Sequence, residues 1–155
     1  MEVTVPENAN GVLYALGGFS GGLSTYVKDG YLHYEYNLFE IHRTQIKSTT
    51  KLPTGDVKID VVSRLTSPKL GSALDVTLKE NGTVVAKGQV PITAAVAFTA
   101  NDALDFGSDL GSPVSMDYYD LAPFTFNGEI GVTKISTPQN RTQRGAKAGT
   151  SATVW

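Results

Sequence analysis

Apolar and polar residues alternate along most of this chain, and this pattern restricts the fold more than any other feature of the sequence. Successive side chains of a β-strand point to opposite faces, so alternation is typical of strands with one buried face. No window of about 11 to 18 residues has the apolar spacing of i, i+3, i+4 and i+7 that an amphipathic helix requires. The sequence therefore predicts an all-β protein.

Short strands are expected where β-branched and aromatic residues stand between turn residues. The predicted strands cover residues 12–16, 23–28, 31–37, 43–48, 57–64, 73–79, 83–89, 94–98, 104–107, 124–127 and 130–135. Within residues 31–37, the side chains expected to face the core are Leu32, Tyr34 and Tyr36. Asp29-Gly30 and Asn81-Gly82 are expected to form tight hairpin turns, because both pairs tolerate positive φ angles. Strands at this spacing favour an antiparallel β-sandwich.

The chain of 155 residues has the size of one domain with one core. Hydrophobic residues make up 41% and charged residues 18%, which is a globular composition. Residues 1–10 are expected to be an N-terminal lead-in, and residues 11–137 to form the sandwich. Residues 138–155 lack periodicity, which predicts a flexible tail.

Composition excludes several classes of function. The sequence has no cysteine, which rules out disulfides, thiol catalysis and thiolate-bound zinc. A net charge of -2 provides no basic stripe for nucleic acid. No apolar stretch is long enough for a membrane span. An export signal would have to lie upstream of Met1, and it would place the protein in the periplasm or outside the cell.

Two strings of unusual composition stand about 75 residues apart. The first contains glycine pairs and tyrosines: Tyr14-Ala15-Leu16-Gly17-Gly18, Gly21-Gly22, Tyr26-Val27-Lys28-Asp29-Gly30, Tyr34, Tyr36 and Asn37. The second is Asp105-Phe106-Gly107, Asp109-Leu110-Gly111-Ser112-Pro113-Val114-Ser115, Asp117-Tyr118, Pro123-Phe124 and Phe126-Asn127-Gly128. In order and spacing, both resemble the segment that follows the catalytic region of bacterial arylsulfatases.

This resemblance implies a jelly-roll sandwich of the concanavalin A or laminin-G type. It also implies that the chain is a non-catalytic C-terminal domain of an arylsulfatase-like sulfuric ester hydrolase. The expected partner is the sulfatase catalytic domain, on which the sandwich would pack or whose entrance it would shape. Sulfatases of this family need a Cys/Ser-x-Pro-x-Arg motif, and Ser136-Thr137-Pro138-Gln139-Asn140 departs from it at the last position. We therefore expect no enzymatic activity from this chain alone.

Acidic residues between positions 102 and 120 are the candidate cation ligands. Calcium binds several carboxylate and carbonyl oxygens, and the residues selected as metal ligands are Asp105, Asp109 and Asp117. The alternative is that these aspartates cap turns through the neighbouring backbone.

Tyrosines are the candidate carbohydrate ligands, because aromatic faces stack on sugar rings. The selected residues are Tyr26, Tyr34, Tyr36 and Tyr118, and a core role is the alternative. They support a second hypothesis for the function, a carbohydrate-binding, lectin-like module for sulfated glycans.

His33 and His42 are expected to be exposed on strands. Glu35 and Glu40 are weighed as a glycosidase pair, which needs two carboxylates facing each other across a cleft.

Overall fold

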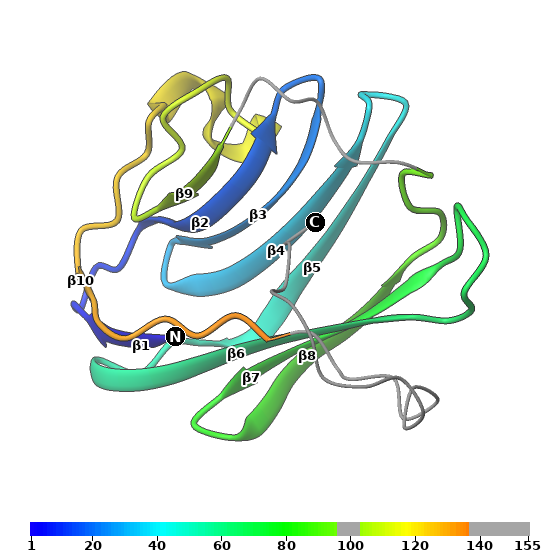
Figure 1. The fold of residues 1–155 in the computed structure, drawn as a ribbon. Helices are drawn as coiled ribbons and strands as arrows, with labels where there is room; N and C mark the ends of the chain where they lie inside the picture. Colours follow the sequence, from blue (N-terminus) through cyan, green and yellow to red (C-terminus); the bar gives the residue numbers. More distant parts are fainter. Residues whose placement is uncertain (96–102, 137–155) are drawn as a thin grey trace, which may run out of the picture.

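The computed structural model describes residues 1–95 and 103–136 and shows in them ten β-strands and a short 3-10 helix, η1 (Met116–Leu121). The strands form two five-stranded antiparallel sheets that face each other as a β-sandwich (Figure 1). The predicted all-β, antiparallel sandwich is therefore confirmed.

One sheet, which we call the covered sheet, has the strand order β5-β4-β3-β2-β9. Its strands are β2 (Gly11–Gly18), β3 (Gly21–Lys28), β4 (Tyr31–Leu38), β5 (His42–Lys51) and β9 (Leu104–Phe106). The other, the open sheet, has the order β10-β1-β6-β7-β8. Its strands are β1 (Glu2–Val5), β6 (Gly55–Leu65), β7 (Leu74–Glu80), β8 (Thr83–Val90) and β10 (Glu129–Ile130). Consecutive strands β2 to β5 and β6 to β8 are neighbours, so most of the chain is a meander.

The predicted strands from residue 12 to residue 89 all coincide with β2 to β8. Asn81 and Gly82 have φ angles of 49° and 83°, and Asp29 and Gly30 have 53° and 82°, as the two predicted hairpin turns require. The tip between β4 and β5 also places two residues, Phe39 and Glu40, at positive φ. The sequence gives no sign of this, because residues 39–41 contain neither glycine nor asparagine.

Outside residues 12–89, the structure differs from several of the expectations. The lead-in of residues 1–10 contains β1, whose Val3 and Val5 are buried beside β6. Residues 124–127 contribute a single bridge from Thr125 to Val12, and the strand expected at 130–135 is reduced to β10. Residues 94 and 95 lie outside any strand, whereas 96–98 and the expected tail fall outside the described residues.

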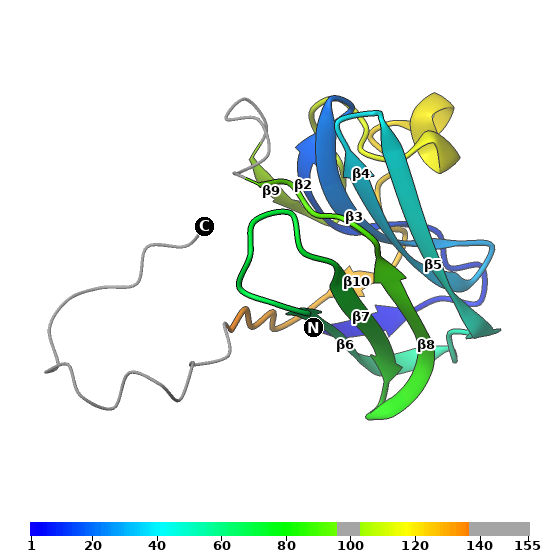
Figure 2. The ribbon, with the colours of Figure 1, turned by 90° about the vertical axis from the view of Figure 1, so that its right-hand side faces the viewer.

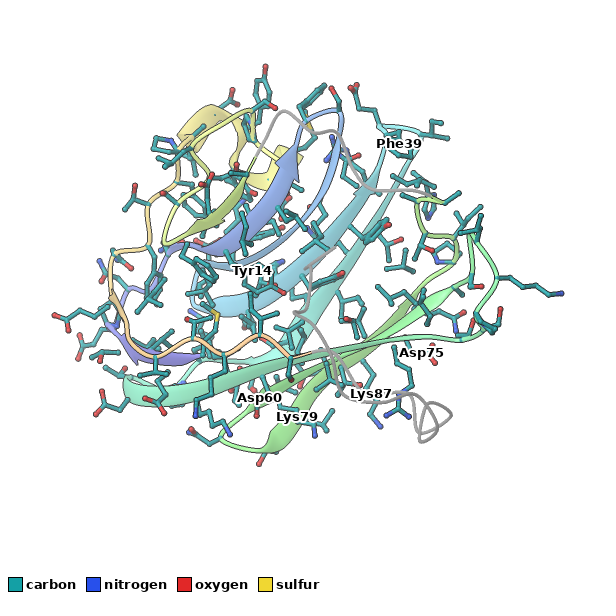
Figure 3. The ribbon with its side chains drawn as sticks, in the orientation of Figure 1. Tyr14, Phe39, Asp60, Asp75, Lys79 and Lys87 are labelled. Carbon is teal, nitrogen blue, oxygen red and sulfur yellow. The ribbon has the colours of Figure 1, made fainter. Side chains whose placement is uncertain are left out.

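The main core lies between the sheets. Leu32, Tyr34 and Tyr36 point into it from β4, as predicted, and meet Ile59 and Leu78 of the open sheet among its buried residues. The outer face of the open sheet carries charged residues beside the exposed Val62 and Val84. Asp60, Asp75, Lys79 and Lys87 project from it away from the covered sheet (Figure 3).

A third layer covers the outer face of the covered sheet. It is formed by the segment of residues 107–124, which includes η1, and Figure 2 shows η1 on the side away from β6, β7 and β8. Val12 and Tyr26 from the sheet pack with Val114 and Tyr118 in a second, separate core. Strands β3 and β4 are thus buried on both faces, which explains why almost every residue in them is inaccessible to solvent.

Glycines occupy both sides of the β2–β3 hairpin, where Gly17 pairs with Gly22 and Gly18 with Gly21. Gly17 has a φ of +83°, and a Cβ atom there would lie 2.3 Å from the Gly21 carbonyl oxygen. The two strands approach closely at this hairpin, and no larger residue fits at Gly17 without a shift of the backbone.

Alanine at Gly17 should destabilise the protein much more than alanine at Gly82, although both glycines have a φ of +83°. Gly82 has no atom within 4 Å of an added Cβ, so Gly82→Ala costs only the left-handed backbone, about 1 kcal/mol. Gly17→Ala adds a clash with a backbone oxygen, for a total of about 3 kcal/mol. Urea unfolding of the two variants measures the difference, and equal losses would show that the hairpin can relax around the methyl group.

Candidate functional site

The chemically reactive side chains gather on the covered face of the β5-β4-β3-β2-β9 sheet. Antiparallel register places them in rows across three strands, because residues that pair across neighbouring strands point to the same side. One row is Tyr26, His33 and Lys47, and the next is Ser24, Glu35 and Gln45. We use the name polar cluster for five residues of this face and two of the covering segment. The five are Tyr26, His33, Glu35, Gln45 and Arg43, which pairs with Asn37, and the two are Ser115 and Asp117.

Asp117 of η1 is bound to two strands of the sheet. Its Oδ2 accepts hydrogen bonds from the Tyr26 hydroxyl at 2.8 Å and from Gln45 Nε2 at 2.7 Å. The Lys28 ammonium donates to the Asp117 backbone carbonyl at 2.7 Å. Burial alone raises the pKa of Asp117, but the hydrogen bonds from Tyr26 and Gln45 and the charge of Lys28 outweigh it and lower the pKa. Asp117 is therefore a fixed carboxylate that holds η1 on the sheet.

Glu35 is the other carboxylate of the cluster, and it is buried, whereas the Asp117 side chain is 34% exposed. Arg43 Nη1 lies 3.0 Å from Glu35 Oε1, and the Ser115 hydroxyl donates to Glu35 Oε2. Ser115 also accepts a bond from the Asp117 backbone N–H at 3.0 Å, as an N-cap residue does. Glu40 lies on the exposed β4–β5 tip, so the structure does not place Glu35 and Glu40 across a cleft from each other.

His33 is buried, with 4% of its surface exposed, so the expectation of an exposed histidine was wrong at this position. The covering layer is the reason, since it excludes water from a face that alternation alone assigns to solvent. The imidazole stacks on Tyr26 with ring centroids 4.9 Å apart. Neither ring nitrogen has a hydrogen-bond partner among the described residues, and Asp117 Oδ2 is 4.0 Å from Nδ1. Burial lowers the pKa of His33 to about 4, whereas His42 is exposed as expected.

Tyr118 joins the covering segment to β3 below the polar cluster. Its hydroxyl lies 2.7 Å from Asp109 Oδ2 and 2.9 Å from the Ser24 hydroxyl. Asp109 Oδ2 also accepts the Val114 backbone N–H at 2.9 Å. Burial raises the pKa of the Tyr118 hydroxyl, so it stays a hydrogen-bond donor at all physiological pH values.

The four candidate carbohydrate-binding tyrosines all lie inside the protein. Tyr26, Tyr34, Tyr36 and Tyr118 are each at most 5% exposed. Tyr34 and Tyr36 belong to the main core, whereas Tyr26 and Tyr118 belong to the second core. None of these rings offers a free face to a sugar in this structure.

The candidate metal ligands each bind protein groups. Asp105 accepts the Leu110 backbone N–H at 3.1 Å, as in the turn-capping alternative. Asp109 and Asp117 hold Tyr118 and Tyr26, as described above. In residues 1–95 and 103–136, no three histidine, aspartate or glutamate side chains come together as a metal site would require. A calcium site at Asp105, Asp109 and Asp117 therefore stays a prediction without support from these contacts.

A surface hollow lies elsewhere, between the short edge strands β9 and β10. It is lined by Phe106, Gly107, Ser108, Thr125, Phe126, Gly128, Ile130, Gly131 and Thr133. None of these lining residues can titrate near neutral pH. The hollow therefore lacks the acid, base or charged group that most catalytic sites need.

Comparisons with protein-family models, with curated proteins and with solved structures find no match for this chain. Among the described residues, no helix is long and apolar enough to cross a membrane. The resemblance to arylsulfatases consequently rests on the two strings alone.

Sequence reasoning missed Arg43, Gln45 and Ser115 as members of the polar cluster. A signal was present in β4, where His33, Glu35 and Asn37 alternate with the core residues. Three polar residues on one face are normally read as solvent-exposed. Only the covering segment, which is distant in sequence, turns that face into a buried site.

Acidification should weaken the fold through His33. Its pKa is about 4 in the folded protein and about 6.5 in an unfolded chain, so the unfolded chain takes up the proton first. Stability should then fall as the pH drops from about 6.5 to about 4, by up to about 3 kcal/mol. His33→Phe should lose this slope and His42→Phe should keep it, as measured by urea unfolding at several pH values. An unchanged slope in His33→Phe would assign the pH dependence to other groups.

Tyr118→Phe, which removes the hydroxyl, should destabilise the protein by about 2 kcal/mol, because Asp109 and Ser24 lose a shared buried partner. Tyr119→Phe is the matched control, since Tyr119 is the next residue and is 48% exposed. It should change stability by less than about 0.5 kcal/mol. Thermal and urea unfolding of the two variants test this, and equal effects would rule out the Tyr118 bonds as a fastening of the covering segment.

Proposed function

We propose that this chain is a non-catalytic β-sandwich domain of an arylsulfatase-like sulfuric ester hydrolase. In the whole enzyme it would pack on the catalytic domain and shape access to it. The observation that carries this proposal is that the two strings resembling arylsulfatases bind each other in the folded protein.

Contacts between the strings fasten the covering segment. Tyr26 and Lys28 of the first string bind the side chain and the backbone carbonyl of Asp117 in the second. Asn37 Nδ2 of the first string lies 3.3 Å from the carbonyl oxygen of Val114 in the second. The matching residues hold the covering segment on the sheet, which is a structural role. The resemblance therefore supports a shared architecture and no shared chemistry.

The state of the polar side chains supports a structural role. Glu35 is paired with Arg43, and Asp117 accepts from Tyr26 and Gln45, so neither carboxylate is free to act as a general base. Ser115 donates to Glu35, and no histidine is within hydrogen-bond distance of it in the described contacts. A hydrolase nucleophile needs such an activating base.

The proposal also includes the type of sandwich that the resemblance implies. A jelly-roll of the concanavalin A or laminin-G type is supported by the two facing sheets. The strand order supports it less, because β2 to β5 and β6 to β8 follow each other as in a meander. A carbohydrate-binding module is the second hypothesis. Burial weakens the version in which sugars stack on Tyr26, Tyr34, Tyr36 and Tyr118.

Binding in trans tests the proposed function. An arylsulfatase that carries both strings would be expressed without its own C-terminal portion, and this chain would be added to it. We expect a complex by size-exclusion chromatography and calorimetry, and a higher melting temperature of the catalytic portion. An unrelated β-sandwich of similar size is the control.

Purified chain alone should not hydrolyse p-nitrophenyl sulfate above the level of a mock purification. Turnover that follows the protein peak through two chromatographic steps would refute the non-catalytic role. Failure to bind any such catalytic portion would refute the proposed partner.

A further inference from the structure

Three lysines share the face of the covered sheet that carries the polar cluster. Their cross-strand partners are Tyr31 for Lys28, His33 for Lys47 and Tyr31 for Lys51. They therefore point to the same side of β3, β4 and β5 as the buried imidazole.

Tyr31 holds two of these ammonium groups in place. The Nζ atoms of Lys47 and Lys51 are 4.2 Å and 5.6 Å from the centre of its ring, within the range of cation–π attraction. Lys28 Nζ is fixed by its bond to the Asp117 carbonyl oxygen. The three positive groups are thus ordered before any ligand arrives, which reduces the entropic cost of binding.

Negative charge close to these lysines is limited. Two carboxylates act on His33, Asp117 and Asp29, and both count against the three lysines, because the hydrogen bonds that Asp117 accepts from the neutral Tyr26 and Gln45 leave its charge in place. Glu35, the other carboxylate of the face, is paired with Arg43. Lys28, Lys47 and Lys51 thus leave an excess of positive charge here, although the whole chain has a net charge of -2.

His33 supplies the second, independent observation. Both of its ring nitrogens are buried and unpartnered among the described residues, although buried polar atoms are normally hydrogen-bonded. Lys28 and Lys47 act on it electrostatically and oppose its protonation. An anion bound to these lysines would remove that opposition, so imidazole and anion would favour each other.

We propose that Lys28, Lys47 and Lys51, with the buried His33 on the same face of the sheet, form a binding site for a tetrahedral oxyanion, such as a sulfate group. Lysine suits this ligand because its ammonium is a compact charge with three donors. The ligand is either a free ion or the sulfate group of a glycan, and the site differs from the buried tyrosines considered above. This inference does not depend on the proposed sulfatase partner.

The two histidines make the site measurable by NMR. The imidazole resonances of His33 and His42 would be titrated with pH in sodium sulfate and in sodium chloride at equal ionic strength. Sulfate should raise the apparent pKa of His33 by about one unit relative to chloride, because it neutralises the lysines nearby. His42, which is exposed, should not respond. Equal values for His33 in the two salts would overturn the proposal.

Paired variants separate this site from general charge effects. Lys47→Ala/Lys51→Ala should abolish the sulfate-dependent increment at His33. Lys79→Ala/Lys87→Ala removes the same charge from the outer face of the open sheet and should leave the increment intact (Figure 3). An increment that persists in the first double variant, or disappears in the second, would contradict a site at Lys47 and Lys51.

Sugars identify the source of the anion. A sulfated disaccharide that shifts His33 at lower concentration than inorganic sulfate would assign the site to sulfated glycans. A shift that needs equal or higher concentration would assign it to the free ion. The unsulfated disaccharide should have no effect, and a shift caused by it would overturn the proposal that an oxyanion is recognised.

Discussion

Burial on both faces of the covered sheet is the condition on which the rest of this protein depends. A strand with one wet face can leave its polar residues to water, but β3 and β4 have no such face. Each polar side chain that points toward the covering segment must find a partner inside the protein or pay for its desolvation. The bonds of Tyr26, Glu35 and Asn37 to that segment follow from this condition.

The sequence was sufficient for the strands but not for the layers. Alternation located β2 to β8, and the Asp29-Gly30 and Asn81-Gly82 turns fixed two hairpins, because these signals are local. It could not show that residues 107–124 return to cover β3 and β4, since no periodicity marks an irregular segment. His33 was consequently placed in solvent, and β1 was missed because four residues are too few for a reliable pattern.

The same limit applies to the candidate site. Of the residues selected by type, Tyr26 and Asp117 share one hydrogen bond and Tyr118 and Asp109 share another, whereas Tyr34 and Tyr36 lie in the main core. Their roles could not be predicted, because an aspartate that fastens a loop and one that binds a metal look alike in sequence. Partners such as Gln45, 72 positions away from Asp117, depend on strand register, which only the folded chain reveals.

The two outermost strands on one side of the sandwich, β9 and β10, have only three and two residues. At the opposite side, the longer β5 and β8 close on each other, with Thr49 donating to the Val85 carbonyl oxygen at 3.2 Å. Exposed strand edges are where other chains attach and where fibrils begin. Because β9 and β10 are this short, they offer another chain little template for strand pairing at this side of the sandwich.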